Sequence, residues 1–199
     1  MKREISICLA MLCIAAFSWG FVGCSGEQVT METKLSDDLN SRMFSLDGVV
    51  YTLPVHFSLL EANGWSFCDV ENGHYVATDI LEPGANAFVF LTNGDLYTEK
   101  TFTNLSEGAL PVSESYITDA SAHFLLNHAP IIFPGNIMLV STYEDVIAAY
   151  GEPENRRVFE ESRTLFYSSD CLYFIVMISI DNETNLVIVM DMRYMPIRN

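Results

Sequence analysis

Basic residues are scarce in this 199-residue chain. Lysine and arginine together number 10, against 26 aspartates and glutamates, and the formal net charge is -16. Because nucleic-acid binding depends on lysine and arginine contacts to phosphates, this composition argues against a nucleic-acid partner. It also disfavours attraction to anionic lipid headgroups, so any membrane association needs another cause.

Familiar catalytic and metal-binding motifs are also missing. The sequence has no HExxH, no His-x-His, no Gly-x-Ser-x-Gly and no phosphate-binding glycine pattern. Its histidines, which we interpret as surface or core residues, lack companions at ligand spacing; they are His56, His74, His123 and His128. We therefore predict no metal site, no cofactor and no catalytic residue, and we expect that the chain is not an enzyme.

Two weaker signals for chemistry remain. Residues 181–185, Asp-Asn-Glu-Thr-Asn, offer oxygen ligands at alternate positions and in this resemble half of a calcium loop. They lack the glycine and the distant bidentate glutamate of an EF-hand, and a polar hairpin tip explains the same residues. A pair of carboxylates for acid and base catalysis also stays open, because 26 acidic residues always include some that lie close together. This argument from number identifies no particular pair.

The long hydrophobic run of the chain lies at its N-terminus. Lys2 and Arg3 precede residues 5–17, an apolar stretch interrupted only by a serine, as in an export signal. The alternative interpretation is an uncleaved transmembrane helix over residues 5–22, which is about long enough to span a bilayer. Export is the better interpretation because a small residue, a cysteine and a polar tail follow the run.

The end of this run, Phe21-Val22-Gly23-Cys24, resembles a bacterial lipobox. The resemblance implies that residues 1–23 are a signal peptide, and that Cys24 receives diacylglycerol and becomes the first mature residue. We therefore expect a protein held by this lipid on the extracytoplasmic face of the cell membrane. Residues 24–42 are polar, without an apolar period, and are predicted to be a tether.

Two cysteines remain in the folded part, Cys68 and Cys171. Export permits a disulfide between them, which would join the two halves of the chain. Two buried free thiols are the alternative.

The clearest local pattern predicts a helix over residues 143–150. Thr142 and Asp145 can form a capping box at its start, and Gly151 ends it. Its apolar residues recur at helical spacing and form one face, which we expect to pack on the C-terminal strands: Tyr143, Val146, Ile147 and Tyr150.

Short apolar runs separated by turn residues predict strands in most of the remaining sequence. Asp47-Gly48 precedes the first of them, and Asn93-Gly94 between two apolar runs is the strongest hairpin signal. An antiparallel meander of three strands is predicted near the C-terminus, over residues 164–168, 172–180 and 186–194. In the last of these strands one apolar face is expected, formed by Leu186, Ile188, Met190, Met192 and Tyr194.

Two further helical segments are expected. Ser58 and Glu61 predict a short helix with a capping box, and residues 120–127 have weak helical spacing. The predicted fold class is therefore α+β, with short helices packed on antiparallel β-sheet in two tandem helix-plus-meander units. These units would be a β-rich one over residues 43–130 and a helix with its meander over residues 131–199.

The segment from Gly135-Asn136-Ile137 to Tyr150-Gly151-Glu152-Pro153, followed by the meander, resembles a known half-domain. It is similar to that of the β-lactamase inhibitor protein and small outer-membrane assembly lipoprotein superfamily. The resemblance implies a short helical element on an antiparallel sheet, once or in tandem, and transfers no catalytic residue. The chain also resembles exported bacterial lipoproteins of unassigned function.

These observations predict a lipid-anchored extracytoplasmic binding or scaffold module without catalytic activity, whose partner is an unidentified cell-envelope protein or ligand. Alternating aromatic residues would form a protein-binding surface wherever their sheet face is uncovered; they are Phe88, Phe90, Tyr97 and Phe102. An alternative, implied by the inhibitor relatives, is that a loop blocks an exported hydrolase. A cell-surface hydrolase that uses paired carboxylates is the second alternative. The candidate binding loops are Asn93-Gly94-Asp95 and the hairpin of Asp181, Glu183 and Asn185.

Overall fold

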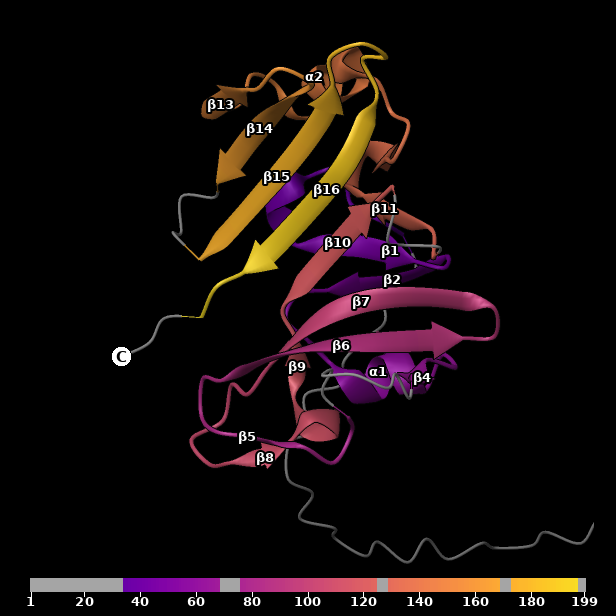
Figure 1. Cartoon of the computed structure of the whole chain (residues 1–199), viewed down its shortest axis with the longest axis vertical. Coiled ribbons are helices and arrows are strands. Elements are labelled where there is room, and N and C mark those ends of the chain that lie inside the picture. Colours follow the sequence, from indigo (N-terminus) through magenta and orange to yellow (C-terminus); the bar gives the residue numbers. More distant parts are fainter. Residues whose placement is uncertain (1–33, 69–75, 125–128, 169–172, 197–199) are drawn as a thin grey trace, which may run out of the picture. The chain divides into compact units, whose positions relative to one another are not determined.

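The computed structural model describes residues 34–68, 76–124, 129–168 and 173–196, which belong to one unit, Met31–Asn199 (Figure 1). This unit is mostly β, with 49% strand and 15% helix. Its strands form four antiparallel sheets, which include a half-barrel. Its described residues contain only two short α-helices. The predicted α+β class with two tandem helix-plus-meander units is therefore wrong.

The first sheet joins two distant parts of the chain and contains, in order, β12 (Ile137–Met138), β11 (Ile131–Phe133), β1 (Met43–Leu46) and β2 (Val49–Thr52). Asp47 and Gly48 connect β1 to β2 and both have positive φ, 50° and 78°, as a type I′ hairpin requires. On its other side β1 pairs with β11. This pairing crosses the boundary expected after residue 130, and so it is one reason why tandem units do not form.

The second sheet contains β3 (Val55–His56), β9 (Tyr116–Ile117), β7 (Leu96–Thr103), β6 (Asn86–Asn93) and β4 (Ser66–Phe67). The predicted hairpin is confirmed, because Asn93 faces Leu96 across the two-residue loop Gly94-Asp95, and Gly94 has a φ of 59°. A separate two-stranded sheet pairs β5 (Ile80–Leu81) with β8 (Leu110–Pro111).

The first α-helix, α1 (Phe57–Glu61), begins two residues earlier than the capping box predicted from the sequence, because its N-cap is His56 and not Ser58. Its N-cap is His56, whose Nδ1 accepts the Ser58 backbone N–H at 3.3 Å. The Ser58 hydroxyl lies 2.8 Å from the same nitrogen. The expected capping box of Ser58 and Glu61 is therefore wrong, and the histidine side chain takes the capping role instead.

The third large sheet contains β10 (Asp119–His123), β16 (Val187–Tyr194), β15 (Phe174–Asp181), β14 (Ser162–Ser168) and β13 (Asn155–Val158). Its central meander, β14 to β16, confirms the three predicted strands. The helix expected over residues 120–127 is wrong where it can be checked, because residues 119–123 form β10 and pair with β16. Ala120 and Ala122 face the core there, so tertiary pairing overrides a weak helical pattern.

A register shift explains why only part of the expected apolar face of β16 is correct. Ser179 pairs with Val189 but Ile180 pairs with Val187, so Ile188 is an extra residue in the strand. Beyond this irregularity, Met190 and Met192 are buried as expected. Before it, the alternation is displaced by one position, so Val187 is buried where Leu186 and Ile188 had been expected to be.

The second α-helix, α2 (Tyr143–Tyr150), confirms the predicted helix together with its capping box of Thr142 and Asp145. Its apolar face joins the core through Val146, which is fully buried. The Tyr150 hydroxyl donates to the carbonyl oxygen of Pro134 at 2.6 Å, and the Tyr150 ring meets the Tyr167 ring of β14 edge-on. The helix is therefore held between β14 and the β11–β12 connection.

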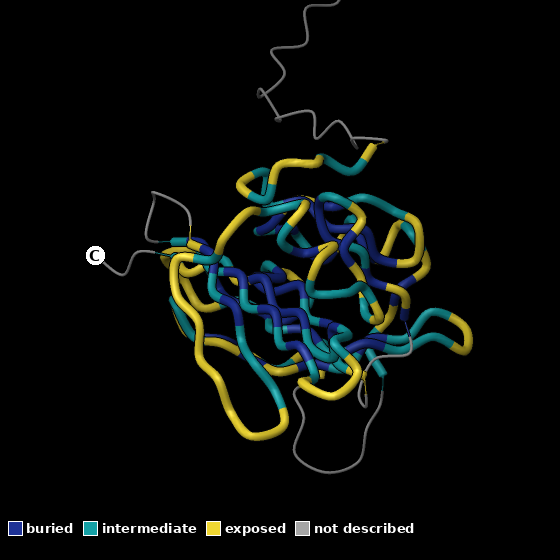
Figure 2. The backbone as a smooth tube through the Cα atoms, turned by 90° about the horizontal axis from the view of Figure 1, so that it is seen from above, coloured by how far each residue is buried: buried dark blue, intermediate teal, exposed yellow. Residues whose placement is uncertain are grey.

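Three 3₁₀ helices complete the described elements: η1 (Leu39–Ser41), η2 (Val112–Glu114) and η3 (Pro134–Asn136). The first lies within the segment expected to be a tether, and Leu39 packs against the core. One continuous apolar cluster includes residues of all three large sheets, from Phe44 to Met192. Figure 2 shows the buried strand segments in dark blue, surrounded by exposed turns in yellow.

Candidate functional site

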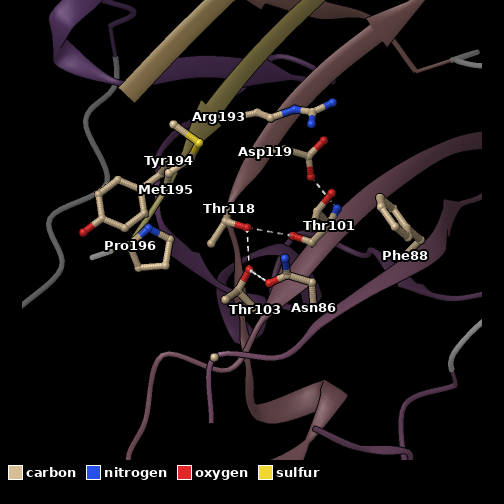
Figure 3. Close-up of a pocket in the computed structure, with 11 residues that line it drawn as sticks. Asn86, Phe88, Thr101, Thr103, Thr118, Asp119, Arg193, Tyr194, Met195 and Pro196 are labelled. Atoms are coloured by element: carbon tan, nitrogen blue, oxygen red, sulfur yellow. Dashed lines mark hydrogen bonds between the residues drawn. The ribbon is translucent and has the colours of Figure 1, made fainter. Parts of the chain in front are cut away.

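A pocket of about 290 Å³ lies beside the β6–β7 hairpin and the C-terminal end of β16 (Figure 3). We call it the threonine pocket. Its polar lining residues are Asn86, Thr101, Thr103, Thr118, Asp119 and Arg193. Its apolar lining residues are Phe88, Tyr194, Met195 and Pro196. The volume is at the small end of the range for ligand pockets, which suits a small solute.

Strand register explains how this lining assembles. On β6, Asn86 and Phe88 are exposed whereas the alternate residues are buried. Asn86 lies opposite Thr103 of β7, and Phe88 lies opposite Thr101. Because alternate residues of a strand share one face, these four side chains form a two-by-two patch on the outer face of the hairpin.

The hydroxyl groups form a connected chain. Thr103 Oγ1 donates to Asn86 Oδ1 at 2.9 Å and lies 2.7 Å from Thr118 Oγ1. Thr118 Oγ1 is also 3.4 Å from the carbonyl oxygen of Thr101. Since the single Thr103 proton is used on Asn86, Thr118 is the donor between the two hydroxyls. This leaves hydroxyl lone pairs as acceptors and the Asn86 amide nitrogen as a donor.

The carboxylate in the lining, Asp119, is held in place by its neighbours. One oxygen accepts the backbone N–H of Thr101, and the other accepts the Ser121 hydroxyl at 2.9 Å. Asp119 is nearly buried, so these hydrogen bonds replace water around its charge. It is a fixed acceptor at the edge of the pocket.

Arg193 is paired with Asp191 two residues before it on β16. Its Nε donates to one carboxylate oxygen at 3.0 Å, and a terminal nitrogen lies 2.5 Å from the other. The Arg193 side chain is 57% exposed and that of Asp191 is 8% exposed. Burial raises the pKa of Asp191, whereas the hydrogen bond to Asp191 raises the pKa of Arg193.

Lys100 lies beneath this group and is fully buried on β7. Its Nζ donates to Thr98 Oγ1 at 2.8 Å, to the Glu99 carbonyl oxygen at 2.9 Å and to the Ser121 carbonyl oxygen at 3.4 Å. Burial lowers the pKa of Lys100, while the charges of Asp119 and Asp191 oppose that change. The ammonium therefore connects β7 to β10 and is an internal counter-charge to the two aspartates.

The charged groups in and beneath the threonine pocket already have hydrogen-bond partners. Asp119 accepts two hydrogen bonds, Asp191 is paired with Arg193, and Lys100 uses all three of its protons. In the part of the chain that the structure describes, there is no group of three or more histidine, cysteine, aspartate or glutamate side chains suited to a metal ion. His56 caps α1 and His123 lies on β10, whereas His74 and His128 fall outside the described residues.

The first predicted binding loop lies at the tip of the β6–β7 hairpin. Gly94 and Asp95 are exposed there. The side chain of Asn93 instead donates to the carbonyl oxygen of Asn63 at 3.2 Å and fixes the hairpin against the end of α1. Only the tip of this loop is therefore displayed to a partner.

The second predicted binding loop connects β15 to β16. Asp181 Oδ1 accepts both the backbone N–H and the hydroxyl of Thr184, at 2.7 and 2.8 Å, and these bonds lower the Asp181 pKa. Asn185 donates to Glu144 Oε2 at 2.8 Å and accepts from Arg163. Glu183 is exposed, so the calcium-like spacing is a turn closed on itself with one acid at its tip. In Figure 1 this loop lies at the top of the view and the β6–β7 tip at its right edge, at the ends of two different sheets.

The predictions for cysteines fall largely outside the described residues. Cys24, the predicted lipid attachment site, and Cys171 both lie outside them. Among the described residues Cys68 has no disulfide partner; it is partly buried, and its backbone N–H donates to the Phe90 carbonyl oxygen. The pairing of Cys68 with Cys171 therefore stays a prediction. Among the described residues, no helix has the length and apolar character needed to cross a bilayer.

The threonine pocket was not predicted from the sequence, although three signals pointed toward it. Phe88 was among the alternating aromatics, and it is 58% exposed whereas Phe102 is buried. Asp191 and Arg193 alternate with Met190, Met192 and Tyr194 in the sequence, and alternation on a strand puts them on the opposite face of β16, where they pair with each other. Thr101 and Thr103, which flank buried Phe102, carry a further signal because polar residues alternate there with an apolar one.

Comparison of the chain with protein-family models, with curated proteins and with solved structures gives no match.

Proposed function

We propose that this chain is a lipid-anchored, extracytoplasmic binding module without catalytic activity, and that the threonine pocket is its ligand site. The observation that carries the proposal is the pocket itself, where polar groups from β6, β7, β10 and β16 converge beside an exposed phenylalanine. A few fixed polar groups against apolar walls are typical of small-ligand sites. The lipobox at Cys24 supports attachment to the membrane.

The state of the titratable groups supports binding over catalysis. A nucleophile or general base needs a lone pair available to substrate, at hydrogen-bond distance from it. Asp119 and Asp191 already accept hydrogen bonds from Ser121 and Arg193. The hydroxyls of Thr103 and Thr118 are bonded to each other, and among the described residues neither has a histidine as a hydrogen-bond partner.

Ligand-observed NMR tests the binding function. The purified full chain in detergent micelles is mixed with sugars, amino acids, small carboxylates and amines. Asn86→Trp fills the pocket with an indole at an exposed strand position. Val158→Trp is the matched control, because Val158 is exposed on β13 and lies outside the pocket. We expect at least one solute class to bind the parent and the control but not Asn86→Trp. If no solute signal depends on Asn86, the binding function is refuted.

Metabolic labelling with radioactive palmitate tests the anchor. The parent chain and Cys68→Ala should incorporate label and sediment with membranes, whereas Cys24→Ala should do neither. Label retained on Cys24→Ala would contradict lipid attachment at this cysteine.

The second candidate is a hydrolase that uses paired carboxylates. The observation that favours it is the closeness of Asp119 and Asp191 on neighbouring strands, together with the raised pKa of Asp191, as a general acid requires. Asp191→Asn would abolish turnover of glycoside or peptide substrates under this function. Absence of turnover by the parent chain on such substrates would leave the binding module.

A further inference from the structure

The threonine pocket presents hydrogen-bond donors and acceptors side by side. The Asn86 Oδ1 is occupied by Thr103, and Figure 3 shows the amide nitrogen without a hydrogen bond to the other lining residues drawn. Thr118 donates toward Thr103 and keeps lone pairs as acceptors. An anion needs donors only and a cation needs acceptors only. A hydroxyl group needs one of each, and the pocket matches that requirement.

The charges of the lining also favour a neutral ligand. Asp119 and Arg193 are the charged lining residues, and they have opposite signs. The guanidinium of Arg193 is already held by two contacts to Asp191, of 3.0 and 2.5 Å. An anionic ligand would have to compete with that carboxylate, in a chain whose net charge is -16. A cationic ligand would find Asp119 already accepting two hydrogen bonds.

An exposed aromatic ring stands beside these polar groups. Phe88 is two residues from Asn86 on the same face of β6, and its ring and that of Tyr194 flank the threonines in Figure 3. A pyranose has an apolar face of C–H groups and a rim of hydroxyls. The C–H face packs on an aromatic ring while the rim bonds to amides and hydroxyls.

We propose that the threonine pocket binds one neutral pyranose residue, with its C–H face on Phe88 and vicinal hydroxyls bonded to the Asn86 amide nitrogen and the Thr118 hydroxyl. The proposal rests on the binding function proposed above and names its ligand class. The volume of about 290 Å³ suits a single sugar residue, free or at the end of a glycan.

The test titrates the full chain with neutral sugars: glucose, galactose, mannose and N-acetylglucosamine. Glucuronate and glucosamine are the anionic and cationic comparisons. A polyoxyethylene detergent keeps the chain in solution, because glycoside detergents would compete for the pocket. Saturation-transfer NMR gives the Kd of each sugar and shows which of its protons contact the protein.

We expect a neutral sugar to bind best, with its axial C–H protons most strongly saturated. Phe88→Ala should raise the Kd about tenfold, which corresponds to an aromatic contact of roughly 1.4 kcal/mol. The control is Phe159→Ala, since Phe159 is 56% exposed and Phe88 58%, and Phe159 lies in the β13–β14 turn outside the pocket. Its Kd should match that of the parent.

A second variant tests the donor. Asn86→Asp keeps an oxygen for the Thr103 hydroxyl but replaces the amide donors with a negative charge. The Kd for the neutral sugar should rise and preference should move toward glucosamine, a change that a fold defect would not produce.

Each other outcome overturns the proposal. Sugar binding that Phe88→Ala leaves intact would place the site elsewhere. If the parent prefers glucuronate or glucosamine, the ligand is not a neutral pyranose, although the binding function stands. The same holds if the parent binds a solute that is not a sugar and Asn86→Trp abolishes that binding. If no solute depends on Asn86, the proposed function itself fails.

Discussion

Replacing Lys100 by methionine should destabilise the protein strongly, although methionine is apolar and of similar length. Lys100 is fully buried, and its Nζ makes two hydrogen bonds of 2.8 and 2.9 Å and a longer one of 3.4 Å. Its removal relieves the cost of burying an ammonium but leaves the nearby carboxylates of Asp119 and Asp191 without its counter-charge. Removing one member of a buried charged group typically costs about 3–5 kcal/mol. We expect a loss of about 3 kcal/mol for Lys100→Met.

Urea denaturation of the purified chain measures this loss. Trp65 is almost fully buried and its fluorescence reports unfolding of the core, with far-ultraviolet circular dichroism as a second signal. With a slope of about 2 kcal/mol/M, the midpoint should fall by about 1.5 M. Lys34→Met is the matched control, since Lys34 is exposed and its loss should change stability by less than about 0.5 kcal/mol.

A double variant shows whether charge is the cause. Asparagine at position 119 keeps an oxygen for the Thr101 N–H but removes the charge that Lys100 compensates. Lys100→Met combined with Asp119→Asn should therefore be at least about 1 kcal/mol more stable than the sum of the single effects predicts.

The pH dependence has a definite sign. Burial lowers the pKa of Lys100 in the folded state, so its ionisation reduces the stability of the parent as the pH falls from 10.5 through the lowered value, and the loss caused by Lys100→Met should be larger above pH 10.5 than at neutral pH. Lys100→Met should remove this dependence. Stability of Lys100→Met within 1 kcal/mol of the parent at neutral pH, or strict additivity with Asp119→Asn, would refute the reasoning.

The remaining predictions concern one glycine and two tyrosines. Gly135 has a φ of +67°, and an added Cβ would lie 2.9 Å from the Cβ of Ala149, so Gly135→Ala should cost more than about 1 kcal/mol. Gly108→Ala, whose Cβ would meet nothing within 4 Å, should stay within about 0.5 kcal/mol in the same urea assay. Burial raises the pKa of Tyr51 and Tyr167 to about 12, so the stability they contribute is present below pH 10 and is lost as the pH rises through 12. Ultraviolet titration of tyrosine should show a late-ionising fraction, and complete ionisation near pH 10 in the folded protein would contradict the burial of both rings.

The parts of the fold that were predictable from the sequence depend on neighbouring residues. Asp47-Gly48 and Gly94 reverse the chain because their backbones adopt positive φ at little cost. The capping box of Thr142 and Asp145 satisfies the first turn of α2 through bonds that span three residues. Such chemistry is local, and a single sequence contains all of it.

The mistakes arise where pairing is distant. β1 pairs with β11, more than 80 positions away, and β10 pairs with β16, about 70 positions away, and no local signal specifies either partner. The extra residue at Ile188 has the same character, because a register shift depends on the neighbouring strand. The prediction of two tandem units rested on local patterns alone. It is wrong because strands of the first half pair with strands of the second half.

The threonine pocket also depends on residues that are far apart in the sequence. Its lining comes from positions 84 to 196 and converges only after both strand pairings have formed. Its electrostatics were hidden for a further reason. A lysine on a strand is ordinarily exposed to solvent. Lys100, one of three lysines in the chain, is instead buried near Asp119 and Asp191. Two buried carboxylates without a counter-charge would each carry a desolvation cost of several kcal/mol. Because Lys100 and Arg193 balance them, the pocket above presents hydroxyls and amides in place of a net charge, and this balance is what makes a neutral ligand the reasonable expectation in so acidic a protein.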